Sequence, residues 1–428
     1  MSPSSNRKKI AIVVQRYGAA VNGGAEVHAR AIAQQLTSHF DITILTSRAI
    51  DHHTWQPVLP AGDSQEEGIH IIRFDHQAGG LSGIKAVKYE ILKSMTKIYS
   101  LFIKNKIRNG RRKGSRLERA FENLKLIKQG PFIPSLVDYI KEQGIKYDAF
   151  IFFTYLYYPT VKGLPWVSSK SILIPTLHDE PAVYRSIYQE LMASPAAIFF
   201  NTEAEKKLAD KIFNISKSIN KIVALGIEVP HVQTDESILE KYGIKKPYLI
   251  YVGRIDKGKG CKRLIQAHKE YIHKKGDRIR LVMAGKSRLR AQEKGEAIFT
   301  GFVSEKEKHQ LISQAATLVM PSPHESLSLA LLEGFAHGIP GLVNGHCEVL
   351  ANHIAGSKGG WTYFNQEEFE KILNHIFEHP DEVKMTGKNA KQYVETNYNW
   401  ETILKTYYEA IEKISHTDKN EQSAKALP

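Results

Sequence analysis

The sequence predicts an α/β protein built from two Rossmann-like domains, each with a parallel sheet. Short β-branched and aromatic runs alternate along the chain with amphipathic helical patterns, which is typical of βαβ units. The alternation lapses once, over residues 228–247, in a polar passage that contains proline, and then begins again. We therefore expect two consecutive domains whose sheets face across a cleft, with ligands at the carboxyl ends of the strands.

The apolar runs expected as strands lie on both sides of this passage. They are IAIVV, DITILT, IHIIRF, DAFIFF, SILIPT, AAIFFN, YLIYVG, IRLVMAG and TLVMPS. The expected limits are residues 1–230 for the first domain and 231–395 for the second. Apolar residues at helical spacing over residues 399–414 predict a closing helix that packs back on the first domain, and residues 415–428 are expected as a flexible tail.

Composition excludes several classes of protein. The 428 residues are 42% hydrophobic and 24% charged, which is typical of a soluble globular protein with an ample core. The first apolar run, IAIVV, is too short for a signal peptide or a membrane span. The two cysteines, Cys261 and Cys347, lack the paired spacing of a disulfide framework or a zinc site. We expect a cytoplasmic protein.

Positive charge is concentrated in one block. The formal net charge is +14, and residues 85–128 carry fourteen Lys or Arg against three Glu. Such a block, expected as a helical insertion, indicates an anionic lipid surface, a phosphate-bearing acceptor or nucleic acid, and a solvated helical face without a partner is the alternative. A nucleic-acid motif is absent and aromatic residues are few, which disfavours nucleic acid.

Within the block, the segment KIYSLFIKNKI, residues 97–107, has the composition of an interfacial helix. Ile98, Leu101 and Phe102 offer an apolar face among lysines. Such a helix would lie on an anionic membrane. The alternative is that these residues face the core of the first domain.

Three strand ends carry candidate site residues. Gly23 and Gly24 stand where the first strand leads into a helix, although the spacing is not that of a dinucleotide or P-loop motif. In VGRIDKGKG, Arg254 and Lys259 flank a glycine-rich turn that begins at Gly253, and two cations over such a turn suit a diphosphate. His178 follows the run SILIPT and can be structural or an active-site hydrogen-bonding group.

Two glutamates bracket an apolar run in PSPHESLSLALLEGFAHGIP, residues 321–340. The run predicts a buried helix that Ser326 or Ser328 caps and that Gly338 ends. Glu325 precedes its first turn, where an anion is favoured. Glu333 stands among leucines and a phenylalanine, and a carboxylate is almost never buried without a partner. A ligand or a donor is therefore expected at Glu333.

Together these motifs resemble the retaining glycosyltransferases of family 4, which have the GT-B fold. The resemblance runs from GGAEVHA through FNTEAEKKL and YVGRIDKGKG to PSPHESLSLALLEGFAHGIPGLV and NYNWETILKTYYEAI. Its most specific element is the pair of glutamates with seven residues between them. Two departures are Ser328, where the family often has glycine, and NGHCEVL at 344–350, in place of a glycine-rich turn.

The resemblance implies a role for each candidate residue. Glu325 would meet the donor sugar and Glu333 the ribose, while backbone N–H groups at Ser328 and Leu329 would meet the diphosphate. By the same resemblance, Arg254 and Lys259, beside Gly253, would contact the diphosphate. Gly23 and Gly24 would form the facing wall of the cleft, and His178 would contact the transferred sugar.

The implied reaction is transfer of a sugar from a UDP- or GDP-linked donor to a hydroxyl group, with retention at the anomeric carbon. The acceptor would be a glycan or a lipid-linked molecule of the cell envelope or a polysaccharide, met at the inner face of the membrane. No Asp-x-Asp motif is present, so no metal and no cofactor beyond the donor is expected. A non-catalytic sugar-nucleotide-binding protein and a sugar-nucleotide epimerase are the alternatives. A phosphorylase would need a pyridoxal-holding lysine, which the sequence does not identify.

Overall fold

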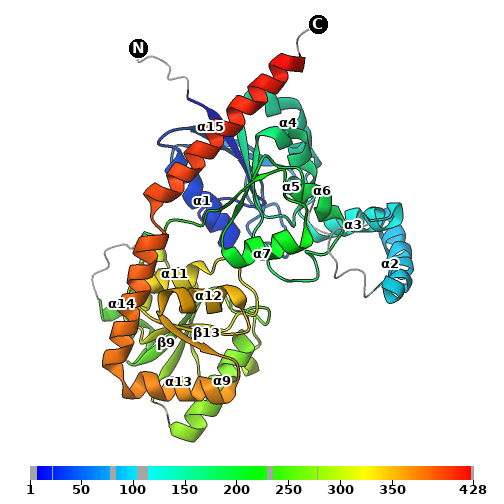
Figure 1. The fold of residues 1–428 in the computed structure, drawn as a ribbon. Coiled ribbons are helices and arrows are strands. Elements are labelled where there is room, and N and C mark those ends of the chain that lie inside the picture. Colours follow the sequence, from blue (N-terminus) through cyan, green and yellow to red (C-terminus); the bar gives the residue numbers. More distant parts are fainter. Residues whose placement is uncertain are drawn as a thin grey trace. The chain divides into compact units, whose positions relative to one another are not determined.

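The computed structural model describes residues 7–21, 23–77, 83–103, 114–228, 235–276 and 278–425, with side chains left out at 95–103 and 416–425. The chain divides into two compact units (Figure 1). The first unit contains residues 1–225 and 401–428, and the second contains residues 226–400. The expected division between the domains was at residues 230 and 231.

The first unit is a doubly wound sheet with the strand order β3-β4-β2-β1-β5-β6-β7-β8. Among the described strands of this sheet, β3 pairs antiparallel with β4 at one edge, and the other neighbours pair in parallel. The strands are β1 (Lys9–Val13), β2 (Asp41–Ser47), β3 (Gly62–Glu66), β4 (Ile69–Phe74), β5 (Ala149–Phe153), β6 (Ser171–Ile174), β7 (Ala197–Phe200) and β8 (Ile219–Ile222). All residues of β5, β6 and β7 are buried, as expected for parallel strands covered on both faces.

The first unit also contains helices, not all of which pack on the sheet. They are α1 (Gly24–Leu36), α2 (Gly83–Ile103), α3 (Arg116–Gln129), α4 (Pro134–Gln143), α5 (Tyr158–Gly163), α6 (Ile187–Met192), α7 (Glu203–Ile212) and α15 (Trp400–Lys425), with 3₁₀ turns at Gly144–Lys146 and Leu164–Lys170. The basic block expected as an insertion includes α2 and α3, and its residues 104–113 lie outside the described residues.

The second unit is a parallel sheet with the strand order β11-β10-β9-β12-β13-β14. This is the order of a Rossmann fold. The strands are β9 (Tyr248–Val252), β10 (Arg280–Ala284), β11 (Ile298–Gly301), β12 (Thr317–Met320), β13 (Gly341–Asn344) and β14 (Gly360–Tyr363). The helices are α8 (Ser237–Tyr242), α9 (Cys261–Lys275), α10 (Glu305–Ser313), α11 (Leu329–Ala336), α12 (Glu348–Ser357), α13 (Gln366–Glu378) and α14 (Pro380–Asn397), with a 3₁₀ turn at Ala291–Glu293. The polar passage 228–247 contains α8.

The closing helix α15 joins the first unit from Glu401 onward. Ile403, Tyr407, Ile411 and Ile414 are all buried along one face. The Tyr407 ring meets that of Phe199 on β7 edge to face at 5.0 Å. This apolar stripe therefore holds the helix against the sheet of the first unit (Figure 1).

Residues 415–425 belong to the segment expected as a flexible tail, and they continue α15 as helix. Extending a helix that is already packed needs no new nucleus, and lysine, glutamine, glutamate and alanine in this stretch favour helix. Among the described residues, every helix is too short or too polar to span a membrane.

We predict that Ile411→Ala destabilises the first unit by about 2–5 kcal/mol, because Ile411 is fully buried and its removal leaves a cavity under α15. Thermal and urea unfolding of the full chain measure the loss. Lys405→Ala, at an exposed position of the same helix, should unfold like the wild type. Equal stability of the two variants would contradict the packing role of this face.

Candidate functional site

The strand order places the switch point of the second unit between β9 and β12. In doubly wound sheets, ligands bind outside the carboxyl ends of the strands at the point where the order reverses. The segment after β9 carries Gly253, Arg254 and Lys259, and the segment after β12 carries Glu325. Sequence-predicted site residues thus lie on both strands that flank the switch point.

An ion pair joins these two segments. Lys259 Nζ donates to Glu325 Oε1 at 2.7 Å, and the Glu325 side chain is only 11% exposed. Asp256 shapes the turn on which both cations stand, because its Oδ1 accepts the backbone N–H of Lys259 at 2.9 Å and its Oδ2 lies 3.8 Å from Arg254 Nε. The turn after β9 therefore holds a lysine ammonium against the first glutamate of the motif.

A glycine allows the two segments to approach. Gly260 has φ +75°, and a Cβ at this position would lie 2.4 Å from the carbonyl oxygen of Pro321. The last glycine of GKG is therefore required by close backbone approach as well as by its left-handed conformation.

The turn NGHCEVL supports the same segment from the other side. Asn344 Nδ2 lies 3.4 Å from the carbonyl oxygens of both Pro321 and Ser322, and its Oδ1 accepts the backbone N–H of His346 at 3.1 Å. An asparagine amide thus holds the loop that leads to Glu325. This contact gives the segment NGHCEVL a structural role in the second unit.

The second glutamate of the motif also has a lysine partner. Lys308 Nζ, from α10, donates to Glu333 Oε1 on α11 at 2.8 Å and to Glu305 Oε2 at 2.7 Å. Burial raises the pKa of Glu333, and the Lys308 ammonium opposes this shift. Burial lowers the pKa of Lys308, but the two carboxylates outweigh it, so the pKa is raised overall. Glu333 therefore has the donor that its burial demands.

Glu305, His309 and Glu333 also form a group that could hold a metal ion, with their ligand atoms within 4.8 Å of one another. Burial lowers the pKa of His309 to about 4, so its imidazole is neutral near pH 7. Both carboxylates already contact Lys308 Nζ, and a divalent cation would have to displace that ammonium. The lysine serves as the cation of this cluster.

Helix α11 begins later than the sequence predicted. Leu329 is its first residue, and Ser328 is the N-cap with φ +67° and no side-chain cap bond, so neither Ser326 nor the Ser328 hydroxyl caps it. Left-handed backbone explains why glycine suits position 328. The N–H groups of Leu331 and Leu332 donate to the Ser328 carbonyl at 3.0 and 3.3 Å, so the N–H groups that precede this bonding at the helix start are those of Leu329 and Ala330.

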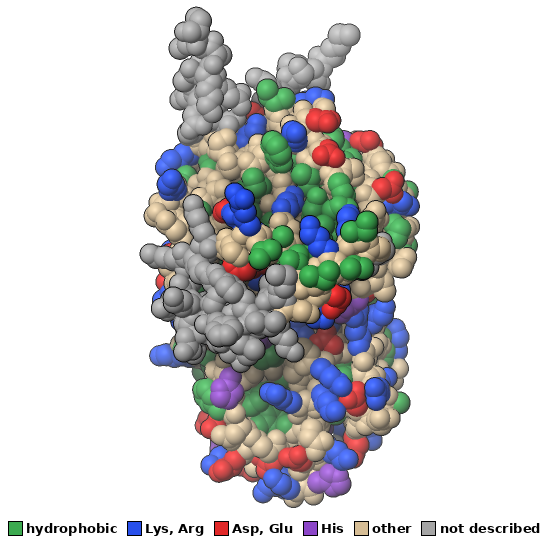
Figure 2. All heavy atoms as spheres, turned by 90° about the vertical axis from the view of Figure 1, so that its right-hand side faces the viewer, with side chains coloured by type: hydrophobic (Ala, Val, Ile, Leu, Met, Phe, Trp, Pro, Cys, Tyr) green, Lys and Arg blue, Asp and Glu red, His purple; other side chains and the backbone are tan. Residues whose placement is uncertain are grey.

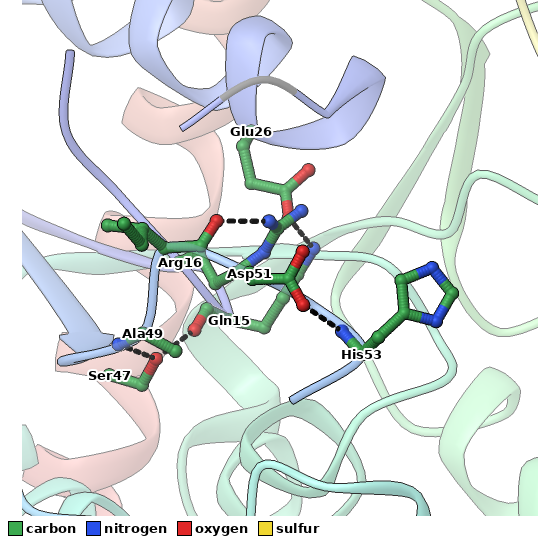
Figure 3. A network of polar contacts seen from close by, with 8 residues as sticks. Gln15, Arg16, Glu26, Ser47, Ala49, Asp51 and His53 are labelled. Atoms are coloured by element: carbon green, nitrogen blue, oxygen red, sulfur yellow. Dashed lines mark hydrogen bonds and ion pairs between the residues drawn. The ribbon is translucent and has the colours of Figure 1, made fainter. Parts of the chain in front are cut away.

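In the first unit, Gly23 has a structural reason of its own. A Cβ at Gly23 would lie 2.0 Å from Glu26 Oε2 and 2.9 Å from Arg16 Nη2, whereas Gly24 meets nothing within 4 Å. Arg16 and Glu26 form a buried ion pair at 2.5 Å (Figure 3). Gln15 Nε2 donates to the same carboxylate oxygen at 2.8 Å. Gly23 leaves room for this pair at the start of α1.

His178 follows β6 and is part of a polar chain. Its Nε2 lies 3.5 Å from Glu180 Oε1, which also accepts the Tyr155 hydroxyl at 2.9 Å. The preceding residue, Leu177, donates its backbone N–H to Glu205 Oε1 at 2.6 Å. Burial raises the pKa of Glu205 to about 8, although backbone N–H groups that it accepts lower it. Glu205 thus anchors the backbone next to His178.

A cavity of about 440 Å³ in the first unit is not lined by Gly23 or His178. Its lining includes Lys9 and Asp41, the first residues of β1 and β2. It therefore opens at the amino ends of the strands, the edge opposite to the one that carries Gly23 and His178.

Sequence reasoning missed several residues of these clusters: Lys308, Asp256, Glu205, Arg16 and Glu26. Lys308 stands 25 positions before Glu333, and no local pattern joins the two. Glu205 falls within FNTEAEKKL and Asp256 within VGRIDKGKG, and a carboxylate at a helix start or in a glycine turn is the signal that could have pointed to them.

Comparison with known proteins links the second unit to sugar transfer. Residues 234–393 match the model of the family Glycosyl transferases group 1. An uncharacterized glycosyltransferase of Methanocaldococcus jannaschii is 26% identical over 238 residues, which cover 49% of this chain and 59% of that protein. The GDP-mannose-dependent alpha-(1-6)-phosphatidylinositol dimannoside mannosyltransferase of Mycobacterium tuberculosis is 30% identical over 139 residues, which cover 31% of this chain and 36% of that protein. The chain spans about half the length of these curated relatives.

The similarity of structure covers both units. The Anabaena protein HepE, solved in complex with UDP and glucose, matches with a TM-score of 0.66 at 15% identity, covering 95% of this chain and all of that chain. At this identity the likeness shows the fold, which is the GT-B fold of two parallel-sheet domains. Family match and fold together support a GT-B glycosyltransferase.

We predict that Ser328→Gly is more stable than Ser328→Ala by about 1 kcal/mol, because only the alanine keeps a Cβ on left-handed backbone. Thermal unfolding of the two variants checks this. Both remove the hydroxyl, so the comparison isolates the backbone. An alanine variant as stable as the glycine variant would show that φ at this position is unstrained.

Proposed function

We propose that this chain is a retaining glycosyltransferase that moves a sugar from a nucleotide-diphosphate sugar to an acceptor hydroxyl in glycan synthesis of the cell envelope. The observation that carries the proposal is the pairing of both motif glutamates with lysines, Glu325 with Lys259 and Glu333 with Lys308, in the unit that matches the family. Each half-buried pair offers a carboxylate for sugar hydroxyls beside a cation.

Glu333 is the proposed ribose ligand. An ionised carboxylate can accept two adjacent hydroxyls, and the ammonium of Lys308 favours the ionised form in a buried place. The donor nucleotide of the Anabaena structure is UDP, and the mycobacterial relative is named for GDP-mannose. Both bases are therefore candidates here.

The diphosphate is proposed to lie between the turn after β9 and the start of α11. Arg254 and Lys259 supply positive charge on one side, and the free N–H groups at Leu329 supply a helix N-terminus on the other. Stabilising the leaving diphosphate is the main electrostatic task of the reaction. This arrangement supports a leaving-group site that needs no metal.

Glu325 is proposed to contact the transferred sugar, with His178 from the first unit as a second contact. In the transfer step, the bond from the anomeric carbon to the phosphate oxygen breaks and a bond to the acceptor oxygen forms. The phosphate oxygen takes the proton of the acceptor hydroxyl on the same face, which gives retention without a protein nucleophile. Proton NMR of the product reports the configuration at the anomeric carbon.

Two alternatives make different products. A non-catalytic sugar-nucleotide-binding protein would bind the donor without consuming it, and an epimerase would change the sugar without an acceptor. Incubation with UDP-glucose and GDP-mannose, followed by chromatography of sugars and nucleotides, separates them. Release of UDP or GDP supports the transferase, and an unchanged donor or an epimerised one contradicts it.

We predict that Glu333→Ala weakens donor binding, whereas Glu325→Ala chiefly lowers kcat. The ribose contact is made in the bound state, while the sugar contact matters most as the bond breaks. Calorimetric titration with nucleotide and initial rates of transfer distinguish the two effects. Glu395→Ala, exposed on α14, is the control, and wild-type behaviour of both motif variants would refute the assignment.

Arg254→Ala and Lys259→Ala are each expected to lower turnover on the order of 10²-fold, as the loss of one charge-stabilising donor does. Lys262→Ala is a matched control, because this lysine follows on α9 and pairs with Glu293 at 3.0 Å, away from the motif. Steady-state kinetics measure all three. If Arg254→Ala and Lys259→Ala are folded and both keep nearly the wild-type rate, the diphosphate binds at another place.

Lys308→Met should make donor binding more sensitive to acid. Burial already raises the pKa of Glu333, and removing the ammonium raises it further. Since protonation abolishes the carboxylate that accepts the ribose hydroxyls, affinity falls as the pH drops through this pKa. The fall should therefore begin at a higher pH in the variant, as titrations across the range show. Lys306→Met, its exposed neighbour, should keep the wild-type profile, and coinciding profiles for all three proteins would exclude the coupling.

A further inference from the structure

Helix α2 is one half of a hairpin whose other half, α3, is anchored in the first unit. Glu122 on α3 accepts the backbone N–H groups of Ser186 and Ile187, at 3.0 and 2.9 Å. Leu126 is buried in the main core. In Figure 1, α2 lies on the outer side of α3, away from the sheet. The hairpin is therefore fixed through α3, and α2 is the outer helix.

One face of α2 is already used for packing on α3. Tyr89, Leu92 and Leu124 form a small buried core, and the ring of Tyr89 stacks on that of Phe121 at 5.3 Å. This cluster accounts for the buried side of the outer helix.

The opposite face of α2 carries an exposed apolar stripe. Ile84, Val87 and Ile91 recur at positions i, i+3 and i+7, so they share one side of the helix. Their exposed fractions are 86%, 62% and 56%. Scattered exposed hydrophobic residues are ordinary, but three in register on one helix face form a surface that a partner covers.

The charge around the stripe identifies the partner. Lys88 is exposed beside the stripe, between Val87 and Ile91 along the chain. Lys85 and Lys93 are also exposed but lie farther round α2, with their ammonium groups 5.3 and 6.0 Å from the ring centroids of Phe132 and Tyr89. All three belong to the block of fourteen Lys or Arg against three Glu. Figure 2, seen from the side on which α2 lies in Figure 1, shows Lys and Arg side chains among hydrophobic ones on the first unit. Two copies of such a block would repel each other, and an apolar stripe does not suit the phosphates of nucleic acid.

We propose that Ile84, Val87 and Ile91 on α2 insert into the interface of an anionic lipid membrane, with Lys88 beside them and other lysines of the basic block attracted to its headgroups. Apolar residues on one face and lysines beside them are what an interfacial helix combines. The expected apolar residues Ile98, Leu101 and Phe102 have side chains outside the described part of the chain, so the stripe rests on the first turns of α2. This surface is separate from the proposed donor site and does not depend on the proposed reaction.

The test is cosedimentation of the full chain with vesicles of phosphatidylcholine alone and of phosphatidylcholine mixed with phosphatidylglycerol, at low and high salt. The wild type should bind the mixed vesicles at low salt and leave them at high salt, because salt screens the lysines. Replacing Ile84, Val87 and Ile91 together by serine should weaken this binding by about tenfold or more.

Matched controls separate this face from general effects. Val58, Ile145 and Ile222 are exposed hydrophobic residues of the same unit, and their triple replacement by serine should leave binding unchanged. Lys88→Glu should weaken binding, whereas Lys384→Glu, which changes the charge equally in the second unit, should not. Unfolding midpoints confirm that all variants are folded.

Three outcomes would overturn the proposal. One is equal binding to neutral and anionic vesicles. Another is a serine triple variant at Ile84, Val87 and Ile91 that binds like the wild type. The third is a wild-type mass in light scattering twice that of this variant, which would assign the stripe to a second copy of the chain.

Discussion

A carboxylate with little exposure to water needs a cation or hydrogen-bond donors, and the second unit is organised around two carboxylates that are each paired with a lysine. Glu325 and Glu333 belong to one motif, yet their partners, Lys259 and Lys308, come from different βα segments of the same sheet. The pairs join the turn after β9 and helix α10 to the segment around α11. Removing either partner would leave a poorly hydrated charge, which is far more costly than the pair itself is stabilising.

The backbone is shaped to permit these pairs. Gly260 lets the turn after β9 approach Pro321, Asn344 holds the same loop from β13, and Ser328 takes a left-handed conformation before α11. Because these adjustments lie at the carboxyl ends of β9 and β12, which flank the switch point, and of β13 next to them, the polar groups converge where an anionic ligand is best received. The first unit uses the same device at its own switch-point strand, where Arg16 and Glu26 pair in the space that Gly23 leaves open.

The two units differ in how much can be inferred from them about function. The second matches a family over residues 234–393 and carries the glutamate motif, so its chemistry can be argued from contacts. The first unit carries the basic hairpin of α2 and α3, and this surface bears on which partner the unit binds.

The sequence by itself determined the fold class, the strands of each sheet centre and the candidate ligands of the site. All nine apolar runs expected as strands became strands, and those of β5, β6 and β7 are buried throughout because helices cover both faces of parallel strands. Four of the strands that escaped notice, β3, β8, β11 and β14, are edge strands with partly exposed residues. The fifth, β13, is internal and mostly buried, but it is only four residues long and begins with glycine. The two motifs also pointed to Glu325, Glu333, Arg254 and Lys259, because a glycine-rich turn and a carboxylate in an apolar run can be recognised from the sequence alone.

Only the tertiary structure decided which residue neutralises which. Lys308, Asp256 and Glu205 became parts of the clusters through contacts between elements, and Ser328 proved to be a strained N-cap instead of a side-chain cap. Likewise, the extension of α15 to Lys425 followed from a helix already held by buried Tyr407 and Ile411. The physical reason is common to these cases. Composition and periodicity indicate that a segment must be buried or must have a charged partner. Which residue becomes that partner depends on how segments distant in the sequence pack together.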